Sequence, residues 1–291
     1  CLLAYKVIEV LKRNHGIVPD HVIEPTCGKG AFVLASAEGF KDAKIHGYEI
    51  NPKYVDVAND EIQANKLKAS VEVKEADLFD VDWEKEISNM QGNLLVIGNP
   101  PWVTSSELGL LNSTNLPDKT NFQNRKGIEA ITGSGNFDIS EWMLLKHVSW
   151  FASRNGAIAF LCKTSVARKV MRQVRQSPEH RFFGHIYPID AKAFFGASVE
   201  ACLFALRTEI GNADCEVYES LESTSPSHVI GERDGLIVSD VEMYEKWRSL
   251  RGQDPAYIWR SGVKHDCSKI MELEKFEDGY VNGFGEKLDL E

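Results

Sequence analysis

Four consecutive residues, Asn99, Pro100, Pro101 and Trp102, form the most chemically specific pattern in the chain. They follow the apolar run Leu94–Ile97, which is typical of a buried strand. Two successive prolines stiffen the backbone and hold the preceding residue extended. The side-chain oxygen of Asn99 and the carbonyl of Pro100 can then converge on one amino group, while Trp102 offers a face to a flat substrate. We predict that this tetrapeptide is the catalytic centre.

Three acidic residues, Glu24, Glu49 and Asp77, each follow or end a predicted strand. Carboxyl ends of parallel strands share one edge of the sheet, where open α/β sheets bind their ligands. Gly28 and Gly30 form a turn between the first strand and a helix, and this turn lets a ligand approach backbone N–H groups. The three acids and the glycine turn therefore predict one nucleotide-like ligand at this edge.

The nature of these residues narrows the choice of ligand. A dinucleotide fold would need a third glycine where Val33 stands. Glu24 suits a cation, and S-adenosylmethionine carries a sulfonium and an ammonium but no phosphate. Glu49 can accept both ribose hydroxyls, and Asp77 can accept from an adenine amino group. The predicted binding residues for this cofactor are Glu24, Pro25, Cys27, Gly28, Gly30, Glu49, Ile50, Asp77, Leu78 and Asn99.

Strand and helix patterns alternate along the first two-thirds of the chain, which is typical of a parallel sheet with crossover helices. We predict a doubly wound, mostly parallel, seven-stranded Rossmann-like α/β sheet with helices on both faces. Its strands are expected at His21–Glu24, Lys44–Glu49, Val71–Glu75, Leu94–Ile97, Ala157–Cys162, Phe182–Ile189 and Ala201–Arg207. Residues 105–135 predict a long loop, the pattern weakens from about residue 220, and residues 263–291 show no clear strand alternation.

Composition and charge set limits on the whole chain. The 291 residues contain no apolar run of about 18 residues, so no membrane span is expected. Six scattered cysteines without a C-x-x-C pair predict reduced thiols in a cytoplasmic protein. The net charge of −10 argues mildly against a nucleic-acid partner, because phosphate contacts need lysine and arginine. The start at Cys1, inside an amphipathic pattern, suggests a piece of a longer protein.

The distribution of charge along the chain matters more than the net charge for binding a nucleic acid. Residues 163–181 hold six basic side chains and one acid, Glu179. Such a run is typical of a solvated helix face or of a surface that contacts phosphates. We predict phosphate contacts from Lys163, Arg168, Lys169 and Arg172, with further contacts from a loop that carries Lys119, Arg125 and Lys126.

Taken in order, Glu24–Gly30, Glu49, Asp77 and Asn99–Trp102 resemble the motifs of class I amino-methyltransferases of the DNA adenine-N6 type, found in restriction–modification systems. The resemblance covers roughly residues 1–208. It implies transfer of a methyl group from S-adenosylmethionine to adenine N6 in a specific sequence of double-stranded DNA, with the base flipped out. A restriction endonuclease, fused or separately encoded, is the implied partner.

Two later segments also resemble motifs of this family. Asn136-Phe137-Asp138 resembles the segment that helps to wall the cofactor and substrate pockets. Phe194-Phe195-Gly196 resembles the segment whose aromatic residue stacks on the flipped base. We favour Phe195, which directly precedes the turn residue Gly196, to stack opposite Trp102. Phe194 is the alternative, and either phenylalanine could belong to the core instead.

The motif order implies a catalytic domain over residues 1–220, followed over 221–291 by a linker and the start of an incomplete target-recognition region. Trp259–Cys267 resembles the lead-in to such a region. The family's Phe/Tyr-x-Thr-Pro-like segment before the first helix is absent, which fits truncation at one or both ends. His265 and Cys267 are two isolated potential ligands, so no metal site is predicted.

Other functions remain open at this point. Cytosine N4, an RNA adenine and a glutamine amide also present a planar conjugated amino group to the same chemistry. A non-catalytic DNA-specificity or scaffolding domain is a different class, and an intact Asn99–Trp102 argues against it. An NAD-dependent oxidoreductase is disfavoured by the missing third glycine and by the Pro-Pro turn.

Overall fold

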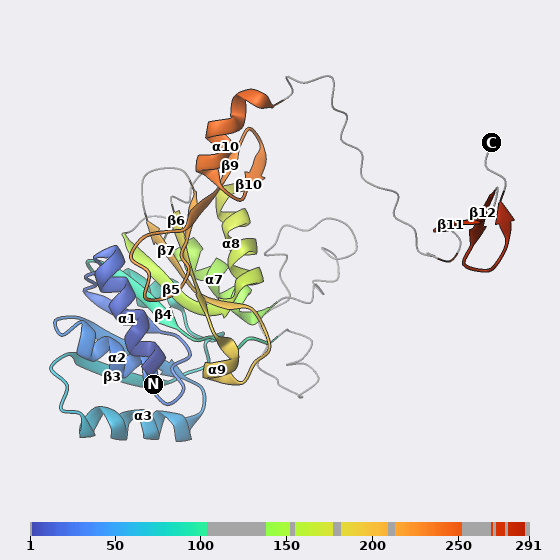
Figure 1. The fold of residues 1–291 in the computed structure, drawn as a ribbon. Coiled ribbons are helices and arrows are strands. Elements are labelled where there is room, and N and C mark those ends of the chain that lie inside the picture. Colours follow the sequence, from blue (N-terminus) through green and yellow to red (C-terminus); the bar gives the residue numbers. More distant parts are fainter. Residues whose placement is uncertain are drawn as a thin grey trace. The chain divides into compact units, whose positions relative to one another are not determined.

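A computed structural model describes residues 2–103, 138–151, 155–176, 182–208, 213–251, 269, 272–276 and 279–288. The chain divides into two units, Cys1–Glu245 and Lys246–Glu291. The first unit contains a ten-stranded sheet and most of the helices (Figure 1). The second contains a three-stranded sheet.

The large sheet has the order β10-β9-β8-β6-β7-β5-β4-β1-β2-β3. Strands β1 to β5 are mutually parallel, whereas β7 runs antiparallel to both of its neighbours, β5 and β6. The first seven strands are β1 (His21–Glu24), β2 (Lys44–Glu49), β3 (Ser70–Glu75), β4 (Leu94–Gly98), β5 (Gly156–Lys163), β6 (Phe182–Ile189) and β7 (Ala201–Thr208). The strand order reverses at β1 and β4, so their carboxyl ends meet where such sheets bind ligands.

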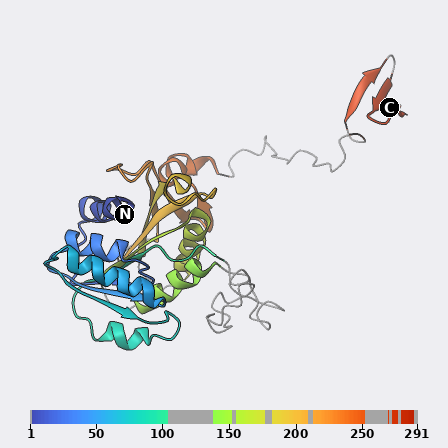
Figure 2. The ribbon, with the colours of Figure 1, turned by 90° about the horizontal axis from the view of Figure 1, so that it is seen from below.

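Helices cover both faces of this sheet, as Figures 1 and 2 show. One face packs against α1 (Leu2–His15) and α2 (Ala31–Gly39), with α3 (Pro52–Ala64) beside them. The other packs against α4 (Trp83–Ser88), α7 (Ile139–Trp150) and α8 (Thr164–Gln176). Because successive residues of a strand point to opposite faces, Leu94 and Val96 enter one core, and Leu95 and Ile97 enter the other. A strand buried on both faces must be continuously apolar, which explains the sequence of β4.

The predicted fold class is confirmed, and the seven expected strands form at their predicted places or within a residue of them. Three more strands extend the sheet beyond β6, so the sheet is larger than the seven strands predicted. They are β8 (Cys215–Val217), β9 (His228–Arg233) and β10 (Leu236–Val238), followed by α10 (Val241–Trp247) and a 3-10 turn, Arg248–Leu250. β8 and β10 have only three residues each, too few for a strand pattern, whereas β9 has six and was missed despite its length. The sheet thus continues past residue 220.

Residues 263–291, which show no clear strand alternation in the sequence, nevertheless contain strands. An antiparallel sheet of β11 (Leu273–Phe276), β12 (Gly279–Asn282) and β13 (Lys287–Leu288) occupies part of this tail. Among its described residues only Asn282 is buried, so alternation of apolar and polar residues gives no signal here. Among the described helices, none combines the length and the apolar character needed to cross a membrane.

The double burial of β4 makes a stability prediction. Leu95→Ala removes a fully buried side chain from the strand that delivers Asn99. We expect it to lower the free energy of unfolding by about 2–5 kcal/mol, through lost burial and a residual cavity. Leu2→Ala is the matched control, since Leu2 is 70% exposed, and it should change stability by less than about 0.5 kcal/mol. Denaturant unfolding measures both, and equal losses would contradict the assignment of β4 to the core.

Candidate cofactor and substrate site

The loop between β1 and α2 is shaped by two glycines with left-handed backbone. Gly28 has φ 54° and Gly30, the N-cap of α2, has φ 83°. Glycine adopts this region without the steric cost that a Cβ atom brings. At Gly30 a Cβ would also lie 3.1 Å from the Cβ of Ala58. Glycine at position 30 is therefore required both by the backbone conformation and by the close approach of α3.

Glu49, at the end of β2, fixes this turn. Its Oε2 accepts a hydrogen bond from the Gly28 N–H at 2.8 Å, and its Oε1 accepts one from the Asn51 N–H at 2.9 Å. Asn51 in turn caps α3 by accepting from the Lys53 N–H. A carboxylate offers about four lone-pair positions, so both Glu49 oxygens keep acceptor capacity for a ligand.

Three buried side-chain oxygens at the ends of β1 and β4 have no hydrogen-bond partner among the described residues. They are Glu24 Oε2, Thr26 Oγ1 and Asn99 Oδ1. Leaving a buried polar atom unsatisfied costs about 1–3 kcal/mol, so such a group is expected to have a function. Three acceptors from adjacent strands suit a ligand that brings several N–H donors, an ammonium among them.

Glu24 is the most strongly perturbed of these groups. Burial raises its pKa well above 4.5, the nearby charge of Glu49 raises it further, and a hydrogen bond from the Val33 backbone opposes the shift. The side chain is 3% exposed and lies against Gly98, where a Cβ would come within 3.4 Å of the Glu24 Cγ. A cation bound beside Glu24 would favour its charged form.

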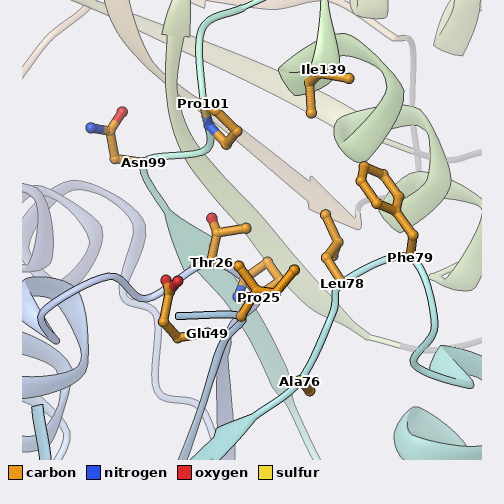
Figure 3. A pocket seen from close by; sticks show the side chains of 10 residues that line it. Pro25, Thr26, Glu49, Ala76, Leu78, Phe79, Asn99, Pro101 and Ile139 are labelled. Carbon is orange, nitrogen blue, oxygen red and sulfur yellow. The ribbon is translucent and has the colours of Figure 1, made fainter. Parts of the chain in front are cut away.

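A pocket of about 320 Å³ opens at this edge of the sheet. Figure 3 shows its side chains, which come from the loops after β1, β2, β3 and β4 and from the start of α7. The lining residues are Pro25, Thr26, Glu49, Ile50, Ala76, Leu78, Phe79, Asn99, Pro101 and Ile139. The volume is in the range of small-molecule sites, and most of the lining side chains are apolar.

Several predicted cofactor residues line this pocket, namely Pro25, Glu49, Ile50, Leu78 and Asn99. The others lie around it. Asp77 accepts from the Phe79 N–H at 2.9 Å through Oδ1, and it thereby orders the loop that follows β3. Cys27 points into the core under α2, and burial raises the pKa of its thiol, so its backbone rather than its sulfur shapes the turn.

Thr26, Ala76, Phe79 and Ile139 were missed as lining residues. Thr26 and Phe79 each adjoin residues that were predicted, so their neighbours were the available signal. Ile139 lies 40 positions after Asn99 and is brought to the pocket by α7, and only the fold reveals that contact.

The predicted catalytic tetrapeptide is anchored to β5 through Trp102. Trp102 is half-buried, and its Nε1–H donates to the Leu161 carbonyl at 3.0 Å. Pro100 is buried, and Pro101 is exposed and lines the pocket. This bond to the β5 backbone fixes the direction of the indole ring relative to Asn99.

The predicted aromatic partner of Trp102 lies beside it. Phe195 ends the short helix α9 (Ala191–Phe195), and its ring centroid is 5.1 Å from that of Trp102 at an angle of 73°. Phe194 and Phe195 are 39% and 40% exposed, so neither is a core residue. Because the rings of Trp102 and Phe195 touch edge to face, a base can enter between them only if they separate.

The four predicted phosphate contacts divide into two pairs. Lys163 Nζ lies 2.8 Å from Asp138 Oδ2, and Lys169 Nζ lies 3.2 Å from Glu141 Oε2, so both ammonium groups have carboxylate partners on or next to α7. The side chains of Arg168 and Arg172 are exposed on α8. The structure therefore leaves the two arginines as the better candidates for phosphate.

Some predicted features lie outside the described residues. They are the basic loop with Lys119, Arg125 and Lys126, the predicted loop over residues 105–135, Asn136 and Phe137, and the segment Trp259–Cys267 with His265. Within the described part of the chain, no group of three or more histidine, cysteine or acidic side chains is placed to hold a metal ion.

Residues 19–106 match the family model described as a methyltransferase domain, and these residues hold β1 to β4 with their loops. Residues 19–106 therefore form a methyltransferase domain. S-adenosylmethionine is the cofactor of such domains.

Three known proteins are similar to all or part of this chain. The type II methyltransferase M.NspV of Nostoc sp. is 40% identical over 293 residues, which is 99% of this chain and 60% of that protein. The tRNA1(Val) (adenine(37)-N6)-methyltransferase of Porphyromonas gingivalis is 30% identical over 31% of this chain and 35% of its own length. The type II methyltransferase M.CvrRI of a Paramecium bursaria Chlorella virus is 31% identical over 30% of this chain and 19% of its own length.

The residues of the methyltransferase domain fit its cofactor. Glu24 Oε2 and Thr26 Oγ1, which have no partner among the described residues, can receive ammonium protons, and Glu49 can receive ribose hydroxyls. Leu78 and Ile50 present apolar surface to an adenine ring within the same pocket. No phosphate-binding residue is required, because the cofactor carries none.

We expect Glu24→Gln to lower the affinity for S-adenosylmethionine and to raise the stability of the protein without cofactor. The folded-state pKa of Glu24 is raised, so its contribution to stability is intact below the unfolded pKa near 4.5 and is lost as pH rises toward the folded pKa. Glutamine does not ionise, so the variant should be more stable than the unmodified protein at pH 7 without cofactor. Its affinity for S-adenosylmethionine should fall at least about tenfold, since a charged hydrogen bond is lost.

Denaturant unfolding at pH 4 to 8 and calorimetric titration with S-adenosylmethionine measure the two effects. Glu38→Gln is the matched control, because Glu38 lies on α2 and bonds the exposed Tyr5 hydroxyl. Unchanged affinity in Glu24→Gln would remove Glu24 from the cofactor site.

Proposed function

We propose that the protein transfers a methyl group from S-adenosylmethionine to the N6 amino group of adenine in a specific sequence of double-stranded DNA. The observation that carries the proposal is the buried Asn99 Oδ1, which has no partner among the described residues and belongs to a side chain that lines the pocket. An acceptor in this position needs an N–H donor from outside the chain.

The tetrapeptide activates the substrate nitrogen through hydrogen bonds. Asn99 Oδ1 and the Pro100 carbonyl accept the two amino hydrogens and draw the nitrogen away from conjugation with the ring. Its lone pair then forms the new N–C bond, and the surplus proton leaves the nitrogen for water. The bound cofactor supplies the electrophilic methyl group, whose bonding electrons return to sulfur. Positioning and fixed dipoles account for most of the rate gain.

The aromatic residues favour a nucleobase as the carrier of this amino group. The Trp102 indole is held by its hydrogen bond to Leu161, and the Phe195 ring lies edge to face against it. A base inside a duplex cannot reach Asn99, so it must be flipped out of the stack. Separation of the two rings would then admit it. Trp102 takes one face and Phe195 the other, with Phe194 as the alternative.

Double-stranded DNA is the proposed polymer. Its support is the exposed arginine pair Arg168 and Arg172 on α8, together with the likeness to type II methyltransferases of 40% and 31% identity. A restriction endonuclease that cuts the same site, fused or separate, is the proposed partner in the cytoplasm. Cytosine N4, RNA adenine and glutamine amides share the activated group and are alternative outcomes of the test below. The domain assignment of residues 1–220 and 221–291 stays a prediction.

Asn99→Ala tests the role of the tetrapeptide. We expect it to lower the rate of methyl transfer at least about 100-fold, since it removes a preorganised acceptor at the reacting atom. The affinity for S-adenosylmethionine should change by less than about fivefold, because the remaining pocket residues are retained. Transfer of labelled methyl groups by the full-length protein to duplex DNA measures the rate, and calorimetry measures the affinity.

The matched control is Asn65→Ala, an exposed C-cap residue of α3 that lies outside the pocket. Structured RNA and a glutamine-bearing protein serve as competing acceptors in the same assay. Transfer that survives in Asn99→Ala, or labelling of RNA or protein in preference to DNA, would contradict the proposal.

A further inference from the structure

Lys163 differs from the exposed arginines of α8 because its ammonium group is paired with a carboxylate of the same chain. The Lys163 ammonium lies 2.8 Å from Asp138 Oδ2, with 26% and 8% of the two side chains exposed. The other oxygen of Asp138 accepts from the backbone N–H and hydroxyl of Ser140, and it caps the start of α7. Every acceptor atom of this carboxylate is therefore engaged, and Lys163 is its only cationic partner among the described residues.

The pair lies at the junction of several site elements. Lys163 is the last residue of β5, and two residues earlier the Leu161 carbonyl accepts from Trp102. On the other side of Asp138, the Ile139 N–H donates to the Val103 carbonyl at 3.0 Å, and Val103 directly follows Trp102. The end of the tetrapeptide is thus bound to β5 through Trp102, and the next residue, Val103, is bound to α7.

The start of α7 also forms part of the cofactor pocket. Ile139 lines the pocket directly, together with Pro101 and Phe79 (Figure 3). Phe79, another lining residue, packs edge to face against Trp142 of α7 with ring centroids 5.1 Å apart. A shift of α7 relative to β5 would therefore move two pocket walls and loosen the segment that holds Trp102.

We propose that Lys163 is a positioning residue: its ion pair with Asp138 locks the start of α7 to the end of β5 and so sets both the cofactor pocket and Trp102. A phosphate contact would require Lys163 to leave Asp138, and a buried carboxylate without its partner is strongly unfavourable. The inference concerns the geometry of the site, and it rests on the proposed function only for its turnover readout.

The test compares Lys163→Met, Asp138→Asn, the double variant and Lys163→Arg. Asparagine still caps a helix, so Asp138→Asn removes the charge and keeps the bond to Ser140. Affinity for S-adenosylmethionine should fall about tenfold in each single variant, and kcat should fall about 100-fold as the site is misplaced. The double variant should lose no more cofactor affinity and no more kcat than the more impaired of the two single variants. Lys163→Arg should keep most of the cofactor affinity and most of kcat.

Two further variants define the contrast. Lys6 lies on α1 and forms an exposed ion pair with Glu222. Lys6→Met breaks this pair and should leave the cofactor affinity and kcat unchanged. Arg172→Met should raise KM for DNA and flatten its salt dependence, with the cofactor affinity unchanged. Lys163→Met should leave the salt dependence as it is, which a phosphate contact would not.

Unchanged cofactor affinity in Lys163→Met, additive losses in the double variant, or a salt dependence like that of Arg172→Met would overturn the proposal. If Lys163→Met does not fold, Asp138→Asn and Lys163→Arg decide the question by the same titration. Cofactor affinity is measured without DNA, so the result stands even if the full-length protein methylates another polymer.

Discussion

The parallel pairing of β1 with β4 is the constraint on which the site depends. Val22 lies opposite Leu95 and Ile23 opposite Val96, so the two strands end together and place Glu24 beside the segment that carries Asn99. Between them the chain leaves buried oxygens without partners among the described residues. Such atoms destabilise the folded protein and are retained where a ligand completes them. The strand register thus brings together the residues that we propose bind the cofactor and the substrate.

Rigid contacts surround these unsatisfied acceptors. Glu49 holds the glycine turn, the Trp102 indole is tied to β5, and Asp138 joins α7 to Lys163. Preorganised groups are effective because they need not be reordered when the reaction occurs. The unsatisfied atoms and the fixed frame are therefore parts of one arrangement, in which local instability is offset by the two cores on either side of the sheet.

The elements that the sequence predicted best were those with a clear local pattern of residue types. The apolar run before Asn99 was predicted as a buried strand and forms β4, and the predicted turn through Gly28 and Gly30 has positive φ at both glycines. Sequence reasoning was weakest for contacts between distant segments, such as Ile139 in the pocket, and for short elements such as α4 and β11 to β13. It also read Lys163 as a free charge, because a partner 25 positions away leaves no local pattern.

The central claim is that Asn99 and the strand ends select an amino nitrogen of a DNA base. Mass analysis of nucleosides from the DNA of cells that express the full-length protein tests it most directly, with an Asn99→Ala strain as the baseline. The account predicts N6-methyladenine in the first strain and its absence from the second. N4-methylcytosine in place of N6-methyladenine, or DNA without any methylated amino group, would contradict it.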